Sequence, residues 1–327
     1  MKAKIKMASA GLLILEVALI FSLFSFIPNE VFAAIGNPNA NVTTWLKIGN
    51  VYPDIVNVSL NGDTSITLTP NETTKVWCAA VVRDYNGETD IMGVNATLYD
   101  SSYTSDTADD NNYHYTNSSC QITLDAGTFN TWDTDNEYYV LANCTFDLEY
   151  YSNPGTWVCN ATAVDAMDWT DTRWNTETVN ELLALGVPDL INYTEVNATE
   201  VSPEQIANVT NLGNVEINLS LHGYGVTDGD NKAMNCTLGN IGYIPIMYEK
   251  YNLSESTATV NSLSEFEATY VNLTGSAVTK QFNLGYRQED TYNEAWNLTY
   301  WRIYVPKGVA GTCNGTIVFG AVVENEL

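Results

Sequence analysis

Short stretches in which apolar and polar residues alternate run through most of the chain. Alternation with a period of two is typical of β-strands, because successive side chains point to opposite faces of a sheet. Helical periodicity is almost absent. The stretches form two groups, 45–60, 73–83, 93–98, 120–124, 138–150 and 156–164, then 207–211, 215–221, 234–238, 267–273, 278–284, 298–305 and 312–323. The pattern predicts an all-β protein.

About seven closely spaced strands in each group are typical of a β-sandwich, in which two antiparallel sheets share one core. Both groups end in a Cys-Asn-x-Thr strand, at Cys159 and at Cys313, which favours tandem copies. Between them, Thr178-Val179-Asn180-Glu181 resembles a helix capping box, and Gly186 follows as a stop signal. We therefore expect two sandwich domains and a short helix or linker between them, at 34–172, 187–327 and 173–186.

The first 33 residues resemble an export signal. Three lysines precede an apolar run at 8–27, and Val31-Phe32-Ala33 fits a small-residue cleavage site. We expect a cleaved signal peptide, and two alternatives stay open. The run is nearly long enough to remain as a membrane helix. Alternatively, the residues around Glu16 resemble a type IV pilin processing site, and the segment from Leu12 to Ile27 would be the core helix of a filament, although Pro28 argues against one long helix.

Sixteen N-x-Ser/Thr sequons without a middle proline occur in the chain. Each is a possible acceptor for N-linked glycan in an exported protein. The middle residue is apolar in 13 of the 16, so a strand would bury that residue and leave Asn and Ser or Thr on the wet face. We expect glycans on the sequon asparagines, which are Asn41, Asn57, Asn71, Asn95, Asn117, Asn143, Asn160, Asn192, Asn197, Asn208, Asn218, Asn235, Asn252, Asn272, Asn297 and Asn314.

Charge limits the partners. The formal net charge of −26 disfavours nucleic acid, whose binding needs a basic footprint, and also an anionic membrane surface. Membrane contact is expected only through residues 8–27, if these are not removed. The acidity favours either plain solubility or binding of a divalent cation.

No cofactor is required by any motif, but calcium is a candidate because hard cations prefer several carboxylate and carbonyl oxygens. No loop has the full twelve-residue calcium pattern. The short turn with Asp228 and Asp230 is a minor candidate. The two main candidate loops supply Asp106, Asp109 and Asp110, and Asp133, Asp135 and Glu137.

Trp77-Cys78 and Thr156-Trp157-Val158-Cys159 resemble the two facing strands of an immunoglobulin-like sandwich. An acidic insertion at 101–119 accounts for the long spacing between these cysteines. The second group, from residue 209 to the strand Tyr300-Trp301-Arg302-Ile303-Tyr304-Val305, resembles the adhesion-type sandwiches of exported archaeal cell-surface proteins. The resemblance implies two tandem immunoglobulin-like domains that are extracellular and non-catalytic, and it implies no particular ligand.

Six cysteines in an exported chain indicate three disulfides, whose connectivity the sequence alone leaves open. The immunoglobulin-like resemblance implies Cys78–Cys159 between the sheets. We expect Cys120–Cys144 to join adjacent strands beside the acidic insertion. We expect Cys236–Cys313 to tie the two sheets of the second domain together.

Catalytic motifs are missing from the sequence. The two histidines, His114 and His222, lack metal-ligand spacing and are expected in solvated loops. There is no Gly-x-Ser-x-Gly motif, and oxidised cysteines leave no thiolate nucleophile. We therefore expect a protein that is not an enzyme.

These observations favour a non-catalytic, N-glycosylated cell-surface protein that is structural, as in a surface layer or envelope, or adhesive. Its expected partners are other cell-surface proteins or copies of itself. The first alternative is a pilin-like filament subunit, and the second is a secreted carbohydrate-active protein. Strand alternation also predicts that the sequon asparagines next to cysteines point outward, which leaves partner contacts to 101–112, 163–174 and the domain junction.

Overall fold

A computed structural model describes residues 39–124, 137–256, 260, 262–288 and 295–323. The chain divides into two units, Met1–Gly49 and Asn50–Leu327. In the first unit, residues 39–49 are all exposed and contain no helix or strand. The expected signal or anchor segment, 1–33, lies outside the described residues. Among the helices that are described, none is both long and apolar enough to cross a bilayer.

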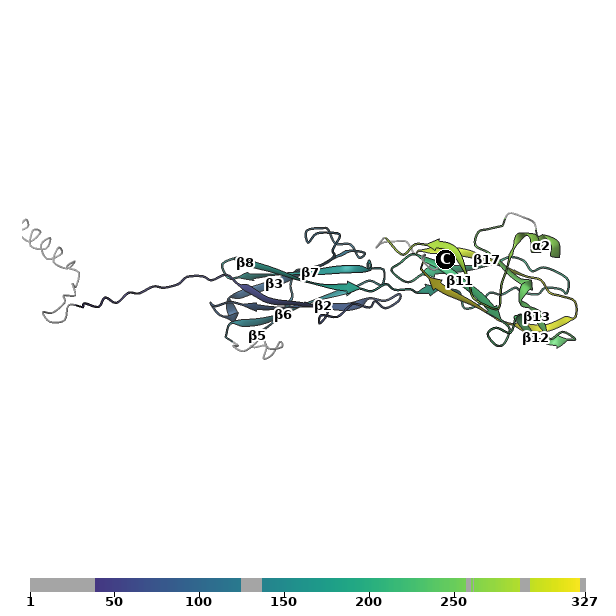
Figure 1. Cartoon of the computed structure of the whole chain (residues 1–327), viewed down its shortest axis with the longest axis horizontal. Helices are drawn as coiled ribbons and strands as arrows, with labels where there is room; N and C mark the ends of the chain where they lie inside the picture. The colour runs from purple at the N-terminus through teal and green to yellow at the C-terminus, as the bar shows by residue number, and fades with distance from the viewer. Residues whose placement is uncertain (1–38, 125–136, 257–259, 261, 289–294, 324–327) are drawn as a thin grey trace, which may run out of the picture. The chain divides into compact units, whose positions relative to one another are not determined.

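The first β-sandwich has two antiparallel four-stranded sheets (Figure 1), with strand orders β1-β2-β6-β5 and β4-β3-β7-β8. One 3-10 turn, η1, precedes β3. The bounds are β1 (Asp54–Leu60), β2 (Thr74–Arg83), η1 (Glu88–Asp90), β3 (Ile91–Asp100), β4 (His114–Asn117), β5 (Gln121–Leu124), β6 (Tyr139–Leu148), β7 (Gly155–Asp165) and β8 (Thr170–Val179).

Strand β7 shows why these residues form a sandwich. Trp157, Cys159, Ala161 and Ala163 are buried, and the residues between them are half-buried on the other face. The buried set joins apolar side chains of both sheets in one core. Burial of one face per strand fixes the register, because a slip by one residue would expose that whole set.

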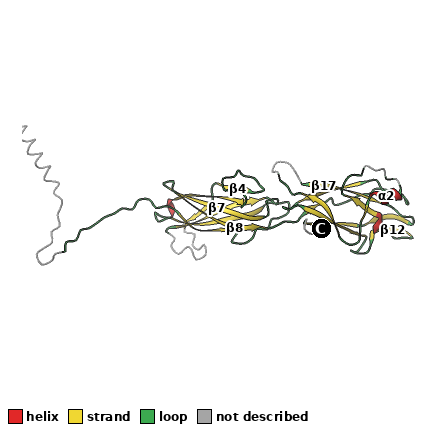
Figure 2. Cartoon of the chain, turned by 45° about the horizontal axis from the view of Figure 1, so that its top comes forward, coloured by secondary structure: helices red, strands yellow, loops and turns green. Residues whose placement is uncertain are grey.

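The second β-sandwich has a five-stranded sheet, β15-β14-β17-β10-β9, and two three-stranded sheets, β16-β11-β19 and β13-β12-β18 (Figure 2). All share one apolar core, in which Trp301 of β17 and Phe319 of β19 lie 5.5 Å apart between ring centroids. The bounds are β9 (Leu185–Gly186), β10 (Gln205–Asn211), β11 (Ile217–Tyr224), β12 (Lys232–Gly239), β13 (Tyr243–Pro245), η2 (Ile246–Tyr248), β14 (Glu249–Asn252), α2 (Leu263–Thr269), β15 (Val271–Asn272), β16 (Val278–Leu284), β17 (Trp296–Ile303), β18 (Val309–Asn314) and β19 (Thr316–Val322). The expected all-β class with tandem sandwiches is therefore confirmed.

Of the expected helix or linker at 173–186, no helix forms, and the connection between the strands is limited to residues 180–184. Strand β8 pairs with β7 as far as Val179, so the first sandwich extends past residue 172. The backbone N–H of Asn180 donates to the Ile66 carbonyl at 2.8 Å, and the N–H of Leu182 donates to Asn214 Oδ1 at 2.6 Å. These donors are satisfied by distant segments rather than by a helix, which overrides the local capping-box signal.

The expected strand at 267–273 is also different, because residues 267–269 belong to helix α2 and only Val271–Asn272 form a strand, β15. Ser262 caps this helix: its hydroxyl accepts from the Glu265 N–H, and the Glu265 carboxylate accepts from the Ser262 N–H. Phe266 is fully buried on the inner side of the helix. Reciprocal capping satisfies two free donors at the helix start, which allows so short a helix to form.

The three disulfides are the pairs that the sequence analysis expects: Cys78–Cys159, Cys120–Cys144 and Cys236–Cys313. The first joins β2 to β7 and so connects the two sheets of the first sandwich. The last differs from its expected role. Cys236 and Cys313 face each other across β12 and β18, so this bond staples neighbouring strands of one sheet rather than two sheets.

Candidate functional site

The sequon asparagines lie mainly on the protein surface. All sixteen belong to the described residues, and every one except Asn218 has an exposed or half-buried side chain. The middle residue is buried in most of the sequons that lie in strands, as at Ala96, Cys144 and Val209, while Leu298 of β17 is half-buried. The four asparagines beside cysteines follow the same rule, since three are exposed and Asn160 is half-buried. The sheet faces are therefore open to modification at these positions.

Asn218 is an exception, and the expectation of a glycan there is wrong for this fold. Its side chain is fully buried in β11, where the pairing with β16 is irregular. The Oδ1 atom accepts the backbone N–H groups of Phe282 at 2.7 Å and Asn283 at 3.0 Å. The carboxamide thus bridges the irregular ladder, and its buried Nδ2 leaves no room for a sugar.

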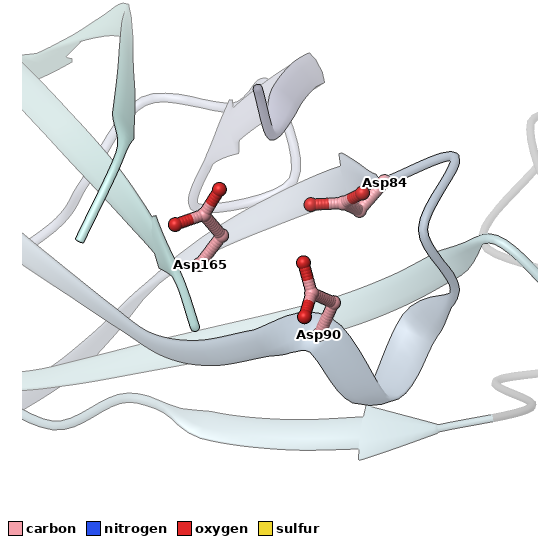
Figure 3. A group of neighbouring side chains, drawn as sticks. All are labelled: Asp84, Asp90 and Asp165. Carbon is pink, nitrogen blue, oxygen red and sulfur yellow. The ribbon is translucent and has the colours of Figure 1, made fainter. Parts of the chain in front are cut away.

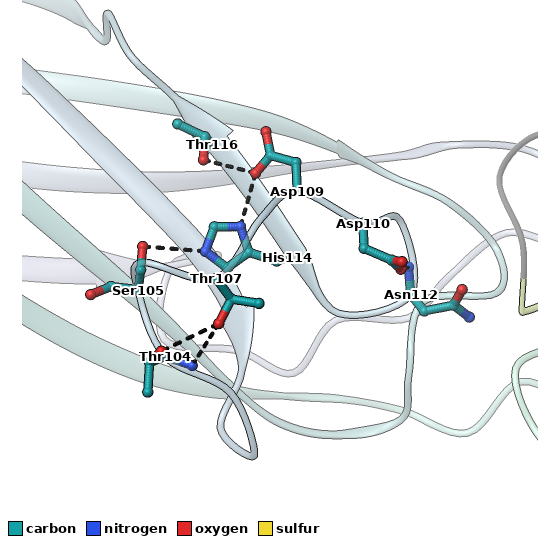
Figure 4. Close-up of polar contacts among 8 residues, drawn as sticks. All are labelled: Thr104, Ser105, Thr107, Asp109, Asp110, Asn112, His114 and Thr116. Atoms are coloured by element: carbon teal, nitrogen blue, oxygen red, sulfur yellow. Dashed lines mark hydrogen bonds and ion pairs between the residues drawn. The ribbon is translucent and has the colours of Figure 1, made fainter.

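The expected calcium loop at 106–110 does not form a carboxylate group of metal-binding spacing among the described residues, and Figure 4 shows the side chains of Asp109 and Asp110 apart from each other. Asp106 accepts the Thr104 hydroxyl, a hydrogen bond that lowers the pKa of Asp106. Asp110 accepts the backbone N–H of Asn112 at 2.9 Å. Each of these carboxylates orders its own turn instead of facing a shared centre. Of the other expected set, Asp133 and Asp135 lie outside the described residues, and Glu137 is exposed.

His114 is buried rather than solvated, which corrects the expectation for this residue. Its side chain is 1 % exposed, with Nδ1 at 2.8 Å from Asp109 Oδ1 and Nε2 at 3.3 Å from the Ser105 carbonyl. The acidic insertion folds over the ring, and Asp109 also accepts the Thr116 hydroxyl at 2.8 Å (Figure 4). The imidazole therefore organises this loop. His222 is half-buried, with Nε2 3.5 Å from Asp228 Oδ1.

Three carboxylates that the sequence analysis did not select converge at one end of the first sandwich (Figure 3). Asp84 follows β2, Asp90 ends η1, and Asp165 ends β7. One carboxylate oxygen from each lies within 4.8 Å of the other two. The pairing of β3 with β7 sets Ile91 opposite Asp165, which brings the end of η1 beside the end of β7.

Tight turns hold these carboxylates in place. Gly87 has a φ of 119°, a conformation that favours glycine, and its N–H donates to the Asp84 carbonyl at 3.0 Å. On the other side, Asp165 Oδ1 accepts the backbone N–H groups of Met167 and Trp169, both at 2.8 Å. The two turns are therefore built around the acidic side chains that they carry.

The acidic cluster (Asp84, Asp90 and Asp165) lacks enough donors for its charge. Asp84 is 0 % and Asp165 1 % exposed. Among the described groups, Oδ2 of Asp84 and Oδ2 of Asp90 are buried without any hydrogen-bond partner. Two carboxylate charges about 5 Å apart repel by about 3 kcal/mol at an effective dielectric constant of 20. The arrangement is therefore costly when its charges face only one another.

Within the part of the chain that the structure describes, the donors that reach the acidic cluster are neutral. Asp84 Oδ1 accepts the Asn86 backbone N–H at 2.8 Å, and Asp165 Oδ2 accepts the Asn50 side-chain amide at 2.5 Å. Burial raises the pKa of Asp84, and the charges of Asp90 and Asp165 raise it further, against the effect of the Asn86 N–H. Burial also acts to raise the pKa of Asp165, but the hydrogen bonds from Asn50, Trp169 and Met167 outweigh it and lower that pKa.

Asp230 shows a carboxylate in the opposite situation. Its two oxygens accept four backbone N–H groups, from Gly225, Val226, Thr227 and Lys232. Burial opposes ionisation there, yet these bonds lower the pKa of Asp230 to about 2. The turn that was a minor calcium candidate is thus satisfied by its own backbone.

The sequence held one local signal for the acidic cluster. Asp84-Tyr85-Asn86-Gly87 is recognisable as a turn, and Asp84 and Asp165 each stand at the end of an apolar strand. Their convergence depends on which strands pair, and single-sequence patterns do not give that pairing.

The second sandwich has a surface hollow of about 730 Å³. Its walls include apolar side chains of β12, β13, β17 and β18, and three sequon asparagines also line it. These lining residues are the apolar Met234, Ile244, Ile303 and Val309 and the sequon asparagines Asn192, Asn197 and Asn314.

Neither a protein-family model nor a curated protein matches the chain. Among solved structures, a chain of the CsuC–CsuE chaperone–tip adhesion subunit pre-assembly complex of Acinetobacter baumannii is 9% identical, with a TM-score of 0.34, over 79% of this chain and 96% of that chain. The C-terminal domain of the Streptococcus pyogenes antigen I/II-family protein AspA is 11% identical, with a TM-score of 0.24, over 84% and 96%. Similarity this low assigns this chain neither a family nor a function.

Proposed function

We propose that the chain is a non-catalytic, N-glycosylated extracellular protein that serves as a structural or adhesive module of a cell surface. The observation that carries the proposal is the division of labour among its asparagines. Every sequon asparagine except Asn218 has an exposed or half-buried side chain, whereas the other fully buried asparagines, Asn112, Asn211 and Asn214, lie outside sequons.

The interior asparagines illustrate this division. Asn112 donates to the Tyr151 carbonyl at 3.0 Å, and Asn211 donates to the Val215 carbonyl at 2.7 Å. Both are buried, and neither belongs to a sequon. Each sandwich carries exposed sequons and at least one internal disulfide. Both features are typical of proteins in an oxidising extracellular compartment.

Glycans at the expected positions disfavour a small-molecule site in the second sandwich. Asn192, Asn197 and Asn314 line its hollow, and sugar on them would cover the opening. Binding sites for small substrates need an accessible concave pocket with a few convergent polar groups. This crowding supports a role in which the outer surface is displayed or packed rather than one in which a substrate is turned over.

Glycans would also limit where protein partners bind. Asn143, Asn235 and Asn314 are exposed on sheet faces, so bulky hydrated sugar there would oppose close packing. The insertion at 101–112 carries no sequon and has mostly exposed residues. We infer that contacts with other cell-surface proteins or with further copies of this chain use such bare loops.

Glycopeptide mass spectrometry on native protein tests the proposal, together with labelling of intact cells by a membrane-impermeant amine reagent. We expect glycans at most of the fifteen accessible sequons, an unmodified Asn218, and labelling without cell lysis. Unmodified asparagines throughout, or a chain labelled only after lysis, would contradict the proposal.

A further inference from the structure

We propose that Asp84, Asp90 and Asp165 bind one calcium ion, which joins the chain segments that meet at this end of the first sandwich. The inference goes beyond the proposed surface role and does not depend on glycosylation.

The spacing of the oxygens suits one ion of this size. Calcium takes six to eight oxygen ligands at about 2.3–2.6 Å, so two ligands on opposite sides of the ion lie about 5 Å apart. One oxygen each from Asp84, Asp90 and Asp165 lies within 4.8 Å of the others. Three carboxylates can therefore share one ion through small side-chain adjustments.

Unpartnered oxygens point to a ligand inside the acidic cluster. Oδ2 of Asp84 is fully buried and lacks a hydrogen-bond partner, and the same holds for Oδ2 of Asp90. Figure 3 shows the Asp84 carboxylate directed toward the other two. Buried polar atoms nearly always have a partner, and a carboxylate without donors is the group that a cation satisfies best.

The comparison with Asp230 separates the acidic cluster from ordinary acidic turns. Four backbone N–H groups surround the Asp230 carboxylate, so its charge is satisfied within the turn. In the acidic cluster, Asp84 accepts one backbone N–H, from Asn86. A carboxylate oxygen of Asp84 also lies within 4.8 Å of one oxygen each of Asp90 and Asp165. Asp230 is thus an example, in the same chain, of a carboxylate whose charge is balanced by backbone N–H groups without a cation.

The ligands come from both sheets and reach a third segment. Asp84 follows a strand of one sheet, and Asp165 ends a strand of the other. Asp165 also accepts the Asn50 amide, and Asn86 Oδ1 accepts the Val51 N–H at 2.7 Å. An ion would therefore fix the β2–β3 connection, the β7–β8 turn and residues 50–51 together.

Calcium titration of the full chain, purified with its disulfides and treated with EDTA, tests the proposal. Extracellular calcium modules have Kd values of about 10⁻⁴–10⁻³ M, so calcium chloride is taken to about 10 mM. We expect one ion per chain by isothermal titration calorimetry. We also expect a rise in Tm of about 5–10 °C when calcium exceeds Kd about a hundredfold.

Two variants locate the ion. Asp90→Asn removes one charge at a side chain whose Oδ2 has no hydrogen-bond partner among the described residues, and we expect calcium affinity to fall at least about tenfold. Asp106→Asn is the matched control, because Asp106 lies in the exposed loop that sequence reasoning favoured, and its response should equal that of the wild type. Equal calcium responses of Asp90→Asn and the wild type would overturn the proposal.

Terbium gives a second readout that does not depend on stability. Trp169 donates its backbone N–H to Asp165, and its ring stacks on Tyr52 with 4.1 Å between ring centroids, so the residue next to the site carries a fixed indole. We expect indole-sensitised terbium luminescence that calcium displaces and that Trp169→Phe weakens, while Trp169→Phe keeps its calcium-dependent Tm. The proposal would be contradicted if calcium left the Tm of the wild type unchanged and Asp84→Asn were more stable than the wild type. That result would mean that the carboxylates of the acidic cluster share a proton instead of binding calcium.

Discussion

Tyr193 donates its hydroxyl hydrogen to Glu249 Oε1 at 2.9 Å inside the second sandwich, where both side chains are buried. Burial raises the pKa of Glu249 to about 7, although the hydrogen bond from Tyr193 acts to lower it. A carboxyl group that titrates near neutral pH inside a core makes the stability of that core depend on pH.

The first prediction is that Glu249 destabilises the fold as pH rises. Between pH 4.5, the ordinary pKa of Glu, and pH 7, the folded protein holds a proton that the unfolded chain has lost, so the free energy of unfolding falls. The full effect is about 3 kcal/mol. Glu249→Gln should match the wild type near pH 4.5 and exceed its stability by up to that amount at pH 8.

Urea denaturation across pH 4.5–8 checks this prediction, with Glu216→Gln as the control because Glu216 is exposed. Only the difference between wild type and variant is read, since other carboxylates also titrate. Parallel pH curves for Glu249→Gln and the wild type would contradict the assigned pKa.

The second prediction ranks two disulfides of the first sandwich. Cys78–Cys159 closes 81 residues and Cys120–Cys144 closes 24. In the chain-entropy model the longer loop is worth about 4–5 kcal/mol and the shorter about 3–4 kcal/mol. The double variant Cys78→Ala/Cys159→Ala should therefore lose more stability in urea than Cys120→Ala/Cys144→Ala. The reverse order would show that loop entropy does not govern this sandwich.

The third prediction concerns Asn218, whose Oδ1 serves two backbone N–H groups. Asn218→Ala would leave both without a partner, which should cost about 2–4 kcal/mol. The exposed Asn208→Ala should stay within about 0.5 kcal/mol. Denaturation of protein made without glycans compares them fairly. Equal losses for the two variants would contradict a structural role for Asn218.

Much of the fold could be predicted from sequence because its signals are local. Alternation at 156–164 identified β7, and sequons placed Cys144 inward and Asn143 outward as observed. Where local signals competed, prediction failed. Alternation predicts a strand at 267–273, but the capping box at Ser262 starts a helix that reaches Thr269. The similar motif at 178–181 predicts a helix or linker, but its Asn180 N–H donates to the distant Ile66 carbonyl.

The acidic cluster was beyond sequence reasoning for a physical reason. A dense run of acidic residues such as 106–110 predicts a cation site from sequence. In the structure, however, Asp106 and Asp110 accept hydrogen bonds from neighbouring hydroxyl and N–H groups of the same loop. Asp84 and Asp165 are 81 residues apart and meet only through strand pairing and sheet packing. The spacing of these residues along the chain therefore does not predict that they lie close together.

The last prediction joins a sequon to an exposed aromatic side chain. Asn160 of β7 lies directly opposite Trp174 of β8, and the Trp174 side chain is 64 % exposed. Directly opposed residues have Cβ atoms about 5 Å apart, so the first sugar on Asn160 would lie over the indole ring. We expect this sugar to shield Trp174 from solvent, because the apolar face of the ring gains from being covered.

Acrylamide quenching of tryptophan fluorescence measures the shielding. Thr162→Ala abolishes the sequon without changing Asn160, and we expect it to increase acrylamide quenching of the fluorescence. This increase should disappear when Trp174 is also replaced by Phe, which would assign it to Trp174. Loss of the threonine hydroxyl is controlled by Thr172→Ala, which removes the other half of the 3.1 Å Thr162–Thr172 contact and keeps the sequon. Unchanged quenching in Thr162→Ala, with mass spectrometry showing that the glycan is gone, would mean that the sugar points away. Trp174 would then be free to serve as a contact for a partner, as the segment 163–174 was expected to do.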